Sequence, residues 1–249
     1  MSTHTTLIYA HRGANKEAAE NTLAAFERAL RYGIDGIETD VQMSRDEIAV
    51  LFHDRFLSKL GLPDKRIDDY DYAQLCEMDF AQHFPDSPHP ESVMRLEDFL
   101  AAYRARCGLL VEIKCRDWES VARKKLKVRQ TLALISDTKN DRILASSFDL
   151  DGLIYGHSIA PDVPLVYNFA PEQGLADAQQ VLVEHPFLHG FCLHISILDE
   201  AIVALLRRHN KLIAVYTCNS DEEIGRALRL SVDILISDLP QKALQMRGG

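Results

Sequence analysis

The sequence predicts an α/β protein built as a TIM-type (β/α)8 barrel, because short apolar segments alternate with amphipathic helical segments along nearly the whole chain. The length of 249 residues suits this fold, since such barrels usually take about 250 residues in one domain. We therefore expect residues 1–249 to form a single barrel domain.

The first elements can be assigned in order. We predict a strand at Leu7–Ala10, a helix at Asn21–Tyr32 with one apolar face, and a second strand at Ile34–Val41. Only Gln42–Glu47 separates this strand from the next apolar segment, Ile48–Phe52, and that link is too short for a crossover helix. We therefore expect the barrel to be distorted near its second and third strands.

Residues 55–91 interrupt the alternation. They are rich in Asp and His and lack sustained periodicity, so we predict a small insertion that leaves the barrel. Nine strand candidates then compete for eight places, and Ile48–Phe52 is the one expected to be irregular. The remaining predicted strands are Leu109–Ile113, Arg142–Ala145, Pro164–Tyr167, Phe191–His194, Leu212–Tyr216 and Ile234–Ile236. The main predicted helices that follow the insertion are Arg95–Arg104, Trp118–Ser136, Glu200–His209 and Glu222–Leu230.

Charge and cysteine content exclude several classes of protein. A net charge of -9 argues against electrostatic binding of nucleic acid or of an anionic membrane. We therefore interpret the basic run Arg123–Arg129 as a solvated helix face. The five cysteines are odd in number and scattered, which indicates reduced thiols. The N-terminus lacks a secretory signal, and no segment is apolar enough to span a bilayer. We expect a soluble, cytoplasmic protein with no membrane anchor and no nucleic-acid partner.

Ionisable residues gather where the predicted strands end, which is where barrels of this type carry their functional groups. Residues two apart on a strand share a face, so Glu38 and Asp40 point the same way, as do Glu112 and Lys114. The full set comprises His11, Arg12, Glu38, Asp40, His53, Asp54, Glu112 and Lys114.

These residue types indicate a particular chemistry. Three inward carboxylates repel one another, so a hard divalent ion such as Mg²⁺, Ca²⁺ or Mn²⁺ is the natural neutraliser, whereas the ligands that zinc prefers are missing. His11 and His53 suit proton transfer near neutral pH, and Arg12 and Lys114 suit a tetrahedral anion. Any one of these side chains alone would fit solvated surface, but inward carboxylates at several strand ends argue against a purely structural role.

Short motifs extend this set along the chain. In order, the sequence contains H-R-G at 11–13, E-N-T at 20–22, E-x-D at 38–40, H-D at 53–54, E-I-K at 112–114, S-F at 147–148, Y-T-x-N at 216–219 and S-D at 237–238. In kind and order, this series resembles the glycerophosphodiester phosphodiesterase family, and most closely its small cytosolic bacterial members.

The resemblance implies roles for individual residues. By it, Glu38, Asp40 and Glu112 bind the metal, His11 and His53 act as acid and base, and Arg12 and Lys114 contact phosphate. Tyr216 would line the glycerol side of the pocket, and Glu20 would support the site. His194 ends another predicted strand, where it is either a further ligand contact or a core histidine.

The sequence departs from the family pattern at two places around the insertion. Glu47 stands where the family commonly has glycine, and Val93-Met94-Arg95 replaces a proline-threonine pair. If the insertion shapes the pocket of the leaving group, these changes bear on which alcohol is preferred and leave the chemistry intact.

The predicted activity is metal-dependent hydrolysis of glycerophosphodiesters to sn-glycerol 3-phosphate and an alcohol. The alternatives are a lysophospholipase D-type enzyme acting on lipids and a non-catalytic barrel that binds phosphodiesters. Attack by the substrate's own hydroxyl through a cyclic phosphate and direct attack by water would use the same residues. The sequence leaves the route and the oligomeric state open.

Overall fold

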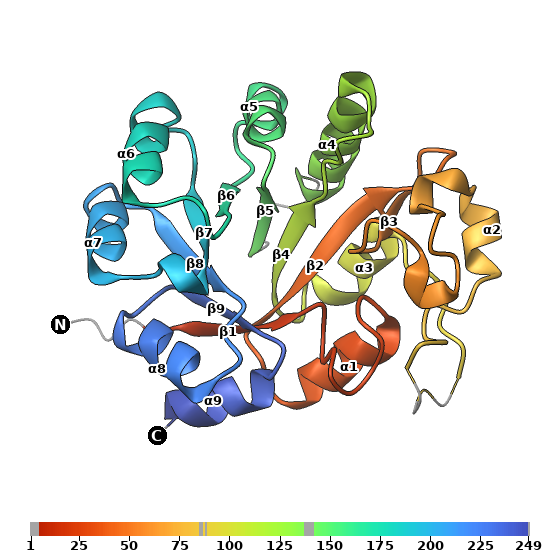
Figure 1. The fold of residues 1–249 in the computed structure, drawn as a ribbon, viewed down its shortest axis with the longest axis horizontal. Coiled ribbons are helices and arrows are strands. Elements are labelled where there is room, and N and C mark those ends of the chain that lie inside the picture. The colour runs from red at the N-terminus through yellow and green to blue at the C-terminus, as the bar shows by residue number, and fades with distance from the viewer. Residues whose placement is uncertain (1–4, 85–86, 88, 137–141, 249) are drawn as a thin grey trace.

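The computed structural model describes residues 5–84, 87, 89–136 and 142–248, and it shows a closed ring of parallel strands surrounded by helices (Figure 1). The first strand pairs with both the second and the last, which closes the ring and confirms the predicted TIM-type (β/α)8 barrel. The ring strands are β1 (Leu7–His11), β2 (Gly36–Met43), β4 (Gly108–Ile113), β5 (Ile143–Ser147), β6 (Leu165–Phe169), β7 (Gly190–His194), β8 (Leu212–Tyr216) and β9 (Ile234–Ser237).

The ninth strand, β3 (Ala49–Leu51), lies outside the ring and runs antiparallel to β2. The predicted irregularity is therefore a hairpin at the carboxyl end of β2. The ring itself stays regular, because β2 also pairs with β4. In the hairpin turn Glu47 has φ 67°, so the chain adopts a left-handed conformation there even without the family's usual glycine.

Helices alternate with the ring strands and cover the outside of the barrel. A membrane-spanning helix needs far more apolar length than any helix in the described part of the chain has. The helices of the barrel are α1 (Leu23–Arg31), α3 (Leu96–Tyr103), α4 (Val121–Ser136), α5 (Leu150–Ile159), α6 (Leu175–Glu184), α7 (Glu200–Arg208), α8 (Asp221–Arg229) and α9 (Pro240–Gly248).

The interpretation of Arg123–Arg129 as a solvated helix face is wrong for Lys127. This side chain is fully buried, and its Nζ lies 2.6 Å from Glu119 Oε1 and 2.5 Å from the carbonyl oxygen of Lys114. A buried ammonium group needs such partners because burial without them disfavours its charge. Lys127 therefore ties helix α4 to the loop that follows β4.

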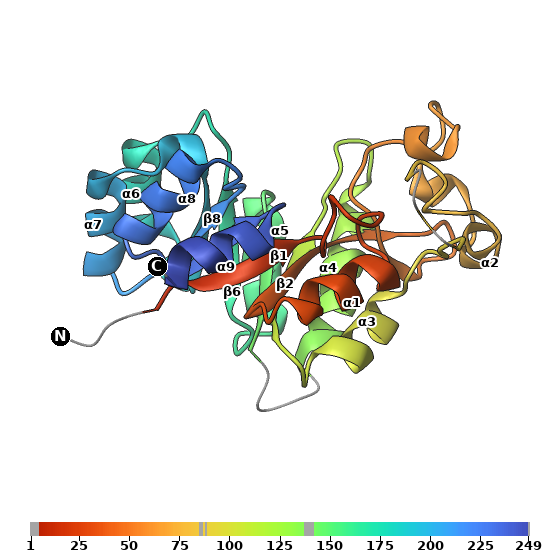
Figure 2. The ribbon, with the colours of Figure 1, turned by 90° about the horizontal axis from the view of Figure 1, so that it is seen from below.

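The described residues between β3 and α3 lie on the opposite side of the molecule from α6 and α7 (Figure 2). The described part of this segment forms η1 (Ser58–Leu60), η2 (Ile67–Asp69) and α2 (Tyr72–Cys76). It packs on β3 through a small apolar cluster of its own, which includes Val50, Phe52, Leu57, Leu60, Ile67, Leu75, Phe80 and Val93. This cluster places Lys59 near the mouth of the barrel.

The interior of the ring is apolar at one end and polar at the other. At the apolar end the ring of Tyr9 fills the barrel, and a Cβ at Gly36 would lie only 2.3 Å from it, so glycine is required there. Further up, the same inner faces carry Glu38, Glu112 and other polar side chains. The carboxyl ends of the strands therefore hold the candidate site, as expected for this fold.

Candidate active site

Three carboxylates meet inside the mouth of the barrel. Glu38 and Asp40 lie on β2, and Glu112 lies on β4 directly opposite Asp40 in the strand register. One oxygen from each carboxylate lies within 4.8 Å of the others, and all three residues are buried. The cluster predicted from strand alternation is thus formed by residues that are up to 74 positions apart in the sequence.

Two cations face this cluster. Lys114 Nζ lies 3.0 Å from Asp40 Oδ1 and 2.6 Å from Glu112 Oε1, and Arg12 Nε lies 2.9 Å from Asp40 Oδ2. Burial alone would raise the pKa of Asp40, but Lys114 and Arg12 outweigh it and hold this pKa well below its ordinary value. For Glu38, burial and then repulsion by Asp40 raise the pKa well above its ordinary value. Lys114 and Arg12 therefore stabilise the ionised form of Asp40 but do not offset the burial of Glu38 and its repulsion by Asp40.

The cluster fits a divalent metal ion. All its donors are carboxylate oxygens, the donor type that Mg²⁺, Ca²⁺ and Mn²⁺ prefer. Among the described residues, Asp40 Oδ1 and Glu112 Oε1 lack a partner with hydrogen-bond geometry, although Lys114 is close to both. A divalent ion would satisfy these oxygens and favour the ionised form of Glu38.

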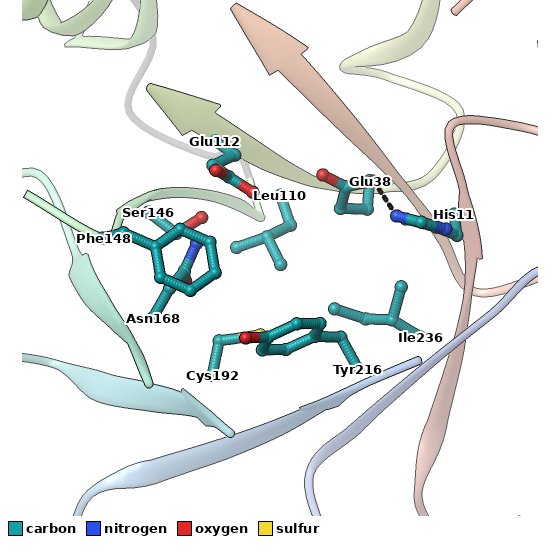
Figure 3. Close-up of a pocket in the computed structure, with 10 residues that line it drawn as sticks. All are labelled: His11, Glu38, Leu110, Glu112, Ser146, Phe148, Asn168, Cys192, Tyr216 and Ile236. Atoms are coloured by element: carbon teal, nitrogen blue, oxygen red, sulfur yellow. Dashed lines mark ion pairs between the residues drawn. The ribbon is translucent and has the colours of Figure 1, made fainter. Parts of the chain in front are cut away.

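His11 stands beside the cluster at the end of β1. Its Nε2 lies 3.8 Å from Glu38 Oε2 (Figure 3), and its Nδ1 lies 2.6 Å from Oδ1 of Asp238, just after β9. Asn15 donates hydrogen bonds to Asp238 Oδ1 and to the His11 carbonyl oxygen, and Asn219 donates to Asp238 Oδ2. The imidazole is therefore held on one side and presents Nε2 to the pocket.

His53 reaches the mouth of the barrel from the segment after β3. Its Nδ1 lies 2.8 Å from Oδ1 of Asp54, and Nζ of Lys59, in η1, lies 3.0 Å from the other oxygen of Asp54. Lys59 also contacts Glu20 at 2.9 Å. His53 thus has a carboxylate partner as His11 does, but that partner comes from the adjacent residue.

Two side chains hold the backbone around His53. Gln42 on β2 donates from Nε2 to the carbonyl oxygens of Phe52 and Asp54, both at 2.9 Å. Arg116, which follows β4, donates to the carbonyl oxygen of His53 between them. Three consecutive carbonyl oxygens therefore accept hydrogen bonds from a side chain of β2 and from one in the loop after β4, which compensates for the absence of a ring strand beneath His53.

The loop after β1 supports the cluster from behind. Arg12 has φ 57°, and it is followed by Gly13, where a Cβ would lie 2.6 Å from the backbone of Ala25. This close turn brings Arg12 Nη1 within 3.2 Å of Glu20. Asn21 Nδ2 donates to Asp40 Oδ2 at 3.1 Å. The H-R-G and E-N-T motifs therefore form one support for Asp40.

A pocket extends from His11 and Glu38 across the barrel mouth (Figure 3). Its outer wall contains the rings of Phe148 and Tyr216, whose centroids are 5.9 Å apart in an edge-on contact. His194 does not line this pocket, but its ring packs edge-on against Tyr216. Tyr216 therefore reaches the candidate site directly, and His194 does so only through Tyr216.

Several residues at the site had no role in the sequence interpretation. The motif containing Asp238 was visible, but its contact with His11 joins residues 227 positions apart. The hydrogen bonds of Gln42 and Arg116 to the backbone left no sequence signal. Strand alternation could have identified Ser146 and Asn168, because each lies two residues after an interior apolar residue.

Comparison with known proteins agrees with this geometry. The model of the glycerophosphoryl diester phosphodiesterase family matches residues 11–242. A glycerophosphodiester phosphodiesterase from Bacillus altitudinis is 28% identical over 249 residues, which cover 97% of this chain and 98% of the relative. Another from Caldanaerobacter subterraneus is 26% identical and covers 98% and 99%.

Solved structures extend the comparison to the fold. A phosphodiesterase from Oleispira antarctica, in complex with the product sn-glycerol-3-phosphate, has a TM-score of 0.86 at 25% identity and covers 98% of each chain. A glycerophosphodiester phosphodiesterase from Parabacteroides distasonis has a TM-score of 0.82 at 21% identity, again over 98% of each chain, which shows a shared fold. Since the family match spans nearly the whole chain and every residue of the carboxylate cluster, the chain belongs to the glycerophosphoryl diester phosphodiesterase family and is an enzyme of that class.

Proposed function

We propose that the protein hydrolyses glycerophosphodiesters to sn-glycerol 3-phosphate and an alcohol, using a divalent metal ion and two histidines. The observation that carries this proposal is the buried cluster of Glu38, Asp40 and Glu112 with His11 beside it. The Oleispira antarctica relative binds sn-glycerol-3-phosphate, which supports the same product here. The five free cysteines fit a reducing compartment, so we infer that the enzyme acts in the cytoplasm.

The roles of the residues follow from their chemistry. Glu38, Asp40 and Glu112 would hold a Mg²⁺, Ca²⁺ or Mn²⁺ ion, which supplies positive charge for the phosphoryl oxygens when bound. Arg12 and Lys114 bind the phosphate from the same side, the first as a planar fork of donors and the second as a point charge.

The two histidines divide the proton transfers. One accepts the proton of the attacking hydroxyl group or water, and the other donates a proton to the oxygen of the leaving alcohol. His11 and His53 each have a carboxylate at Nδ1, which orients the ring and leaves Nε2 for the substrate. Tyr216 packs against the glycerol moiety, and His194 supports it from behind.

The test is the release of glycerol 3-phosphate from glycerophosphocholine and glycerophosphoethanolamine with Mg²⁺, Ca²⁺, Mn²⁺ or EDTA. We expect metal-dependent release that Glu112→Gln and His53→Ala abolish. Glu200→Gln, at an exposed position on α7, is the matched control and should retain activity. Release of choline from lysophosphatidylcholine instead would indicate a lysophospholipase D, and no turnover with any metal would indicate a binding barrel.

A further inference from the structure

Besides Asp40 and Glu112, two uncharged polar side chains on the inner face of the barrel have an atom without a hydrogen-bond partner among the described residues. These atoms are Ser146 Oγ and Asn168 Oδ1. Both residues are almost completely buried, with 1% and 4% of their surface exposed. Buried polar atoms nearly always have a hydrogen-bond partner, and because these two face the pocket, a ligand or an ordered water is the partner expected for them.

Their place in the sheet directs both side chains into the pocket. Ser146 lies on β5 two residues after Leu144, and Asn168 lies on β6 two residues after Val166, and both of these apolar residues belong to the interior cluster. Ser146 is also the register partner of Glu112 on β4. The two polar side chains therefore form a layer beside Glu112, across the pocket from His11 (Figure 3).

The surroundings of Ser146 and Asn168 favour a small, neutral ligand group. The pocket has a cavity volume of about 20 Å³, which leaves room for little more than one water-sized group. At Asn168 Oδ1 a carboxylate or phosphate oxygen would meet another acceptor and could form no hydrogen bond with it. A hydroxyl group matches both atoms, because it can donate to Asn168 Oδ1 and share a hydrogen bond with Ser146 Oγ. Leu110, Phe148 and Tyr216 offer apolar surface for a short carbon chain.

We propose that Ser146 and Asn168 bind the terminal hydroxyl group of the glycerol moiety and thereby determine the preference for glycerol over simpler alcohols. This inference rests on the proposed function, which places the phosphoryl group at the carboxylate cluster. Ser146 adjoins Glu112 on the side of the cluster away from His11. The far end of a glycerol chain attached to that phosphoryl group therefore lies over Ser146 and Asn168.

The experiment compares two substrates that differ by one hydroxyl group. We would measure kcat/KM for glycerophosphocholine and for 2-hydroxypropyl phosphocholine, which lacks only the terminal hydroxyl. The wild type should prefer glycerophosphocholine by about 10- to 100-fold, because the analogue leaves Ser146 and Asn168 without partners. In Asn168→Leu and Ser146→Ala this preference should fall to about threefold or less, mainly through lower kcat/KM for glycerophosphocholine.

A matched control separates recognition from general damage. The Thr131 hydroxyl oxygen on α4 is also buried without a partner among the described residues, but it lies outside the pocket. Thr131→Val should keep the wild-type preference. If wild type hydrolyses neither substrate, the proposed function fails. If wild type hydrolyses both and the two pocket variants keep its preference, or lose both activities in parallel, the hydroxyl subsite is overturned and the proposed function stands.

Discussion

His11 and His53 reach the mouth of the barrel from two different parts of the molecule. His11 ends β1, a ring strand, and its Asp238 partner follows β9, the neighbouring ring strand. His53 follows β3, which lies outside the ring, and its partner is the next residue, Asp54. One histidine is thus positioned by the barrel itself, and the other by a hairpin that the closed ring does not need.

The supports of the two histidines differ accordingly. The His11 side chain is 16% exposed and the His53 side chain 31% exposed. Gln42 and Arg116 bind the backbone around His53, and Lys59 binds its Asp54 partner. A histidine outside the regular scaffold needs side chains from several elements to reach a defined position, because no strand pairing fixes it in the ring.

The largest expected effect tests whether the histidines are equal in the chemistry despite this difference. His11→Asn and His53→Asn should each lower kcat by about 10²–10⁴-fold, because each removes a proton-transfer group. The measurement is steady-state release of glycerol 3-phosphate, with circular dichroism to confirm folding. A loss below about tenfold for either variant would remove that histidine from the acid-base pair.

Replacing the carboxylate partner of each histidine should show that His11 and His53 are supported to different degrees. Asp238→Asn should lower kcat by about 100-fold and Asp54→Asn by about tenfold, because both lose the group that orients the imidazole. The Asp238 side chain is 13% exposed and the Asp54 side chain 28% exposed, so water can replace the second partner more easily. Equal losses would mean that the barrel gives His11 no better support than the hairpin gives His53.

The same contrast governs how much the sequence could predict. Strand alternation placed Glu38, Asp40 and Glu112 on inner faces, and β8 has the predicted bounds Leu212–Tyr216. Regular strands have a period of two, so a single sequence is enough to assign their inner faces. The barrel and its carboxylate cluster were therefore predictable from local pattern.

Contacts between loops were not predictable in this way. The position of Arg116 against the His53 carbonyl oxygen depends on how two loops cross, 63 residues apart. Lys127 was expected on a solvated face. It is buried instead and forms an ion pair with Glu119, which lies eight residues earlier in the chain. Such contacts depend on the path of irregular backbone, which has no period to read.

Arg116 offers a smaller test of the support around His53. Arg116→Met removes the donor to the His53 carbonyl oxygen, and kcat should fall about tenfold with less change in KM, because His53 is displaced while phosphate binding remains. Arg55→Met is the matched control, since Arg55 also stacks on Trp118 but pairs with exposed Asp117. The control should stay within about twofold of wild type. An equal fall in both would assign the effect to the ring of Trp118 instead.

The smallest expected effect is on the pH dependence of the free energy of unfolding, through Asp54, the partner of His53. Burial alone would raise the pKa of Asp54, but its hydrogen bond with His53 and the charge of Lys59 outweigh burial and lower this pKa. A lowered folded pKa stabilises the protein above the unfolded value of about 3.9, and this contribution is lost as the pH falls toward the folded value. Asp54→Asn should therefore lower the free energy of unfolding by about 1 kcal/mol at pH 7, and the difference from wild type should shrink below about pH 4. Urea unfolding across this range measures it, with Asp162→Asn in the exposed loop after α5 as control. A difference that persisted unchanged to pH 2 would show that Asp54 acts through its shape and not through its charge, and the hairpin would then hold His53 without electrostatic help.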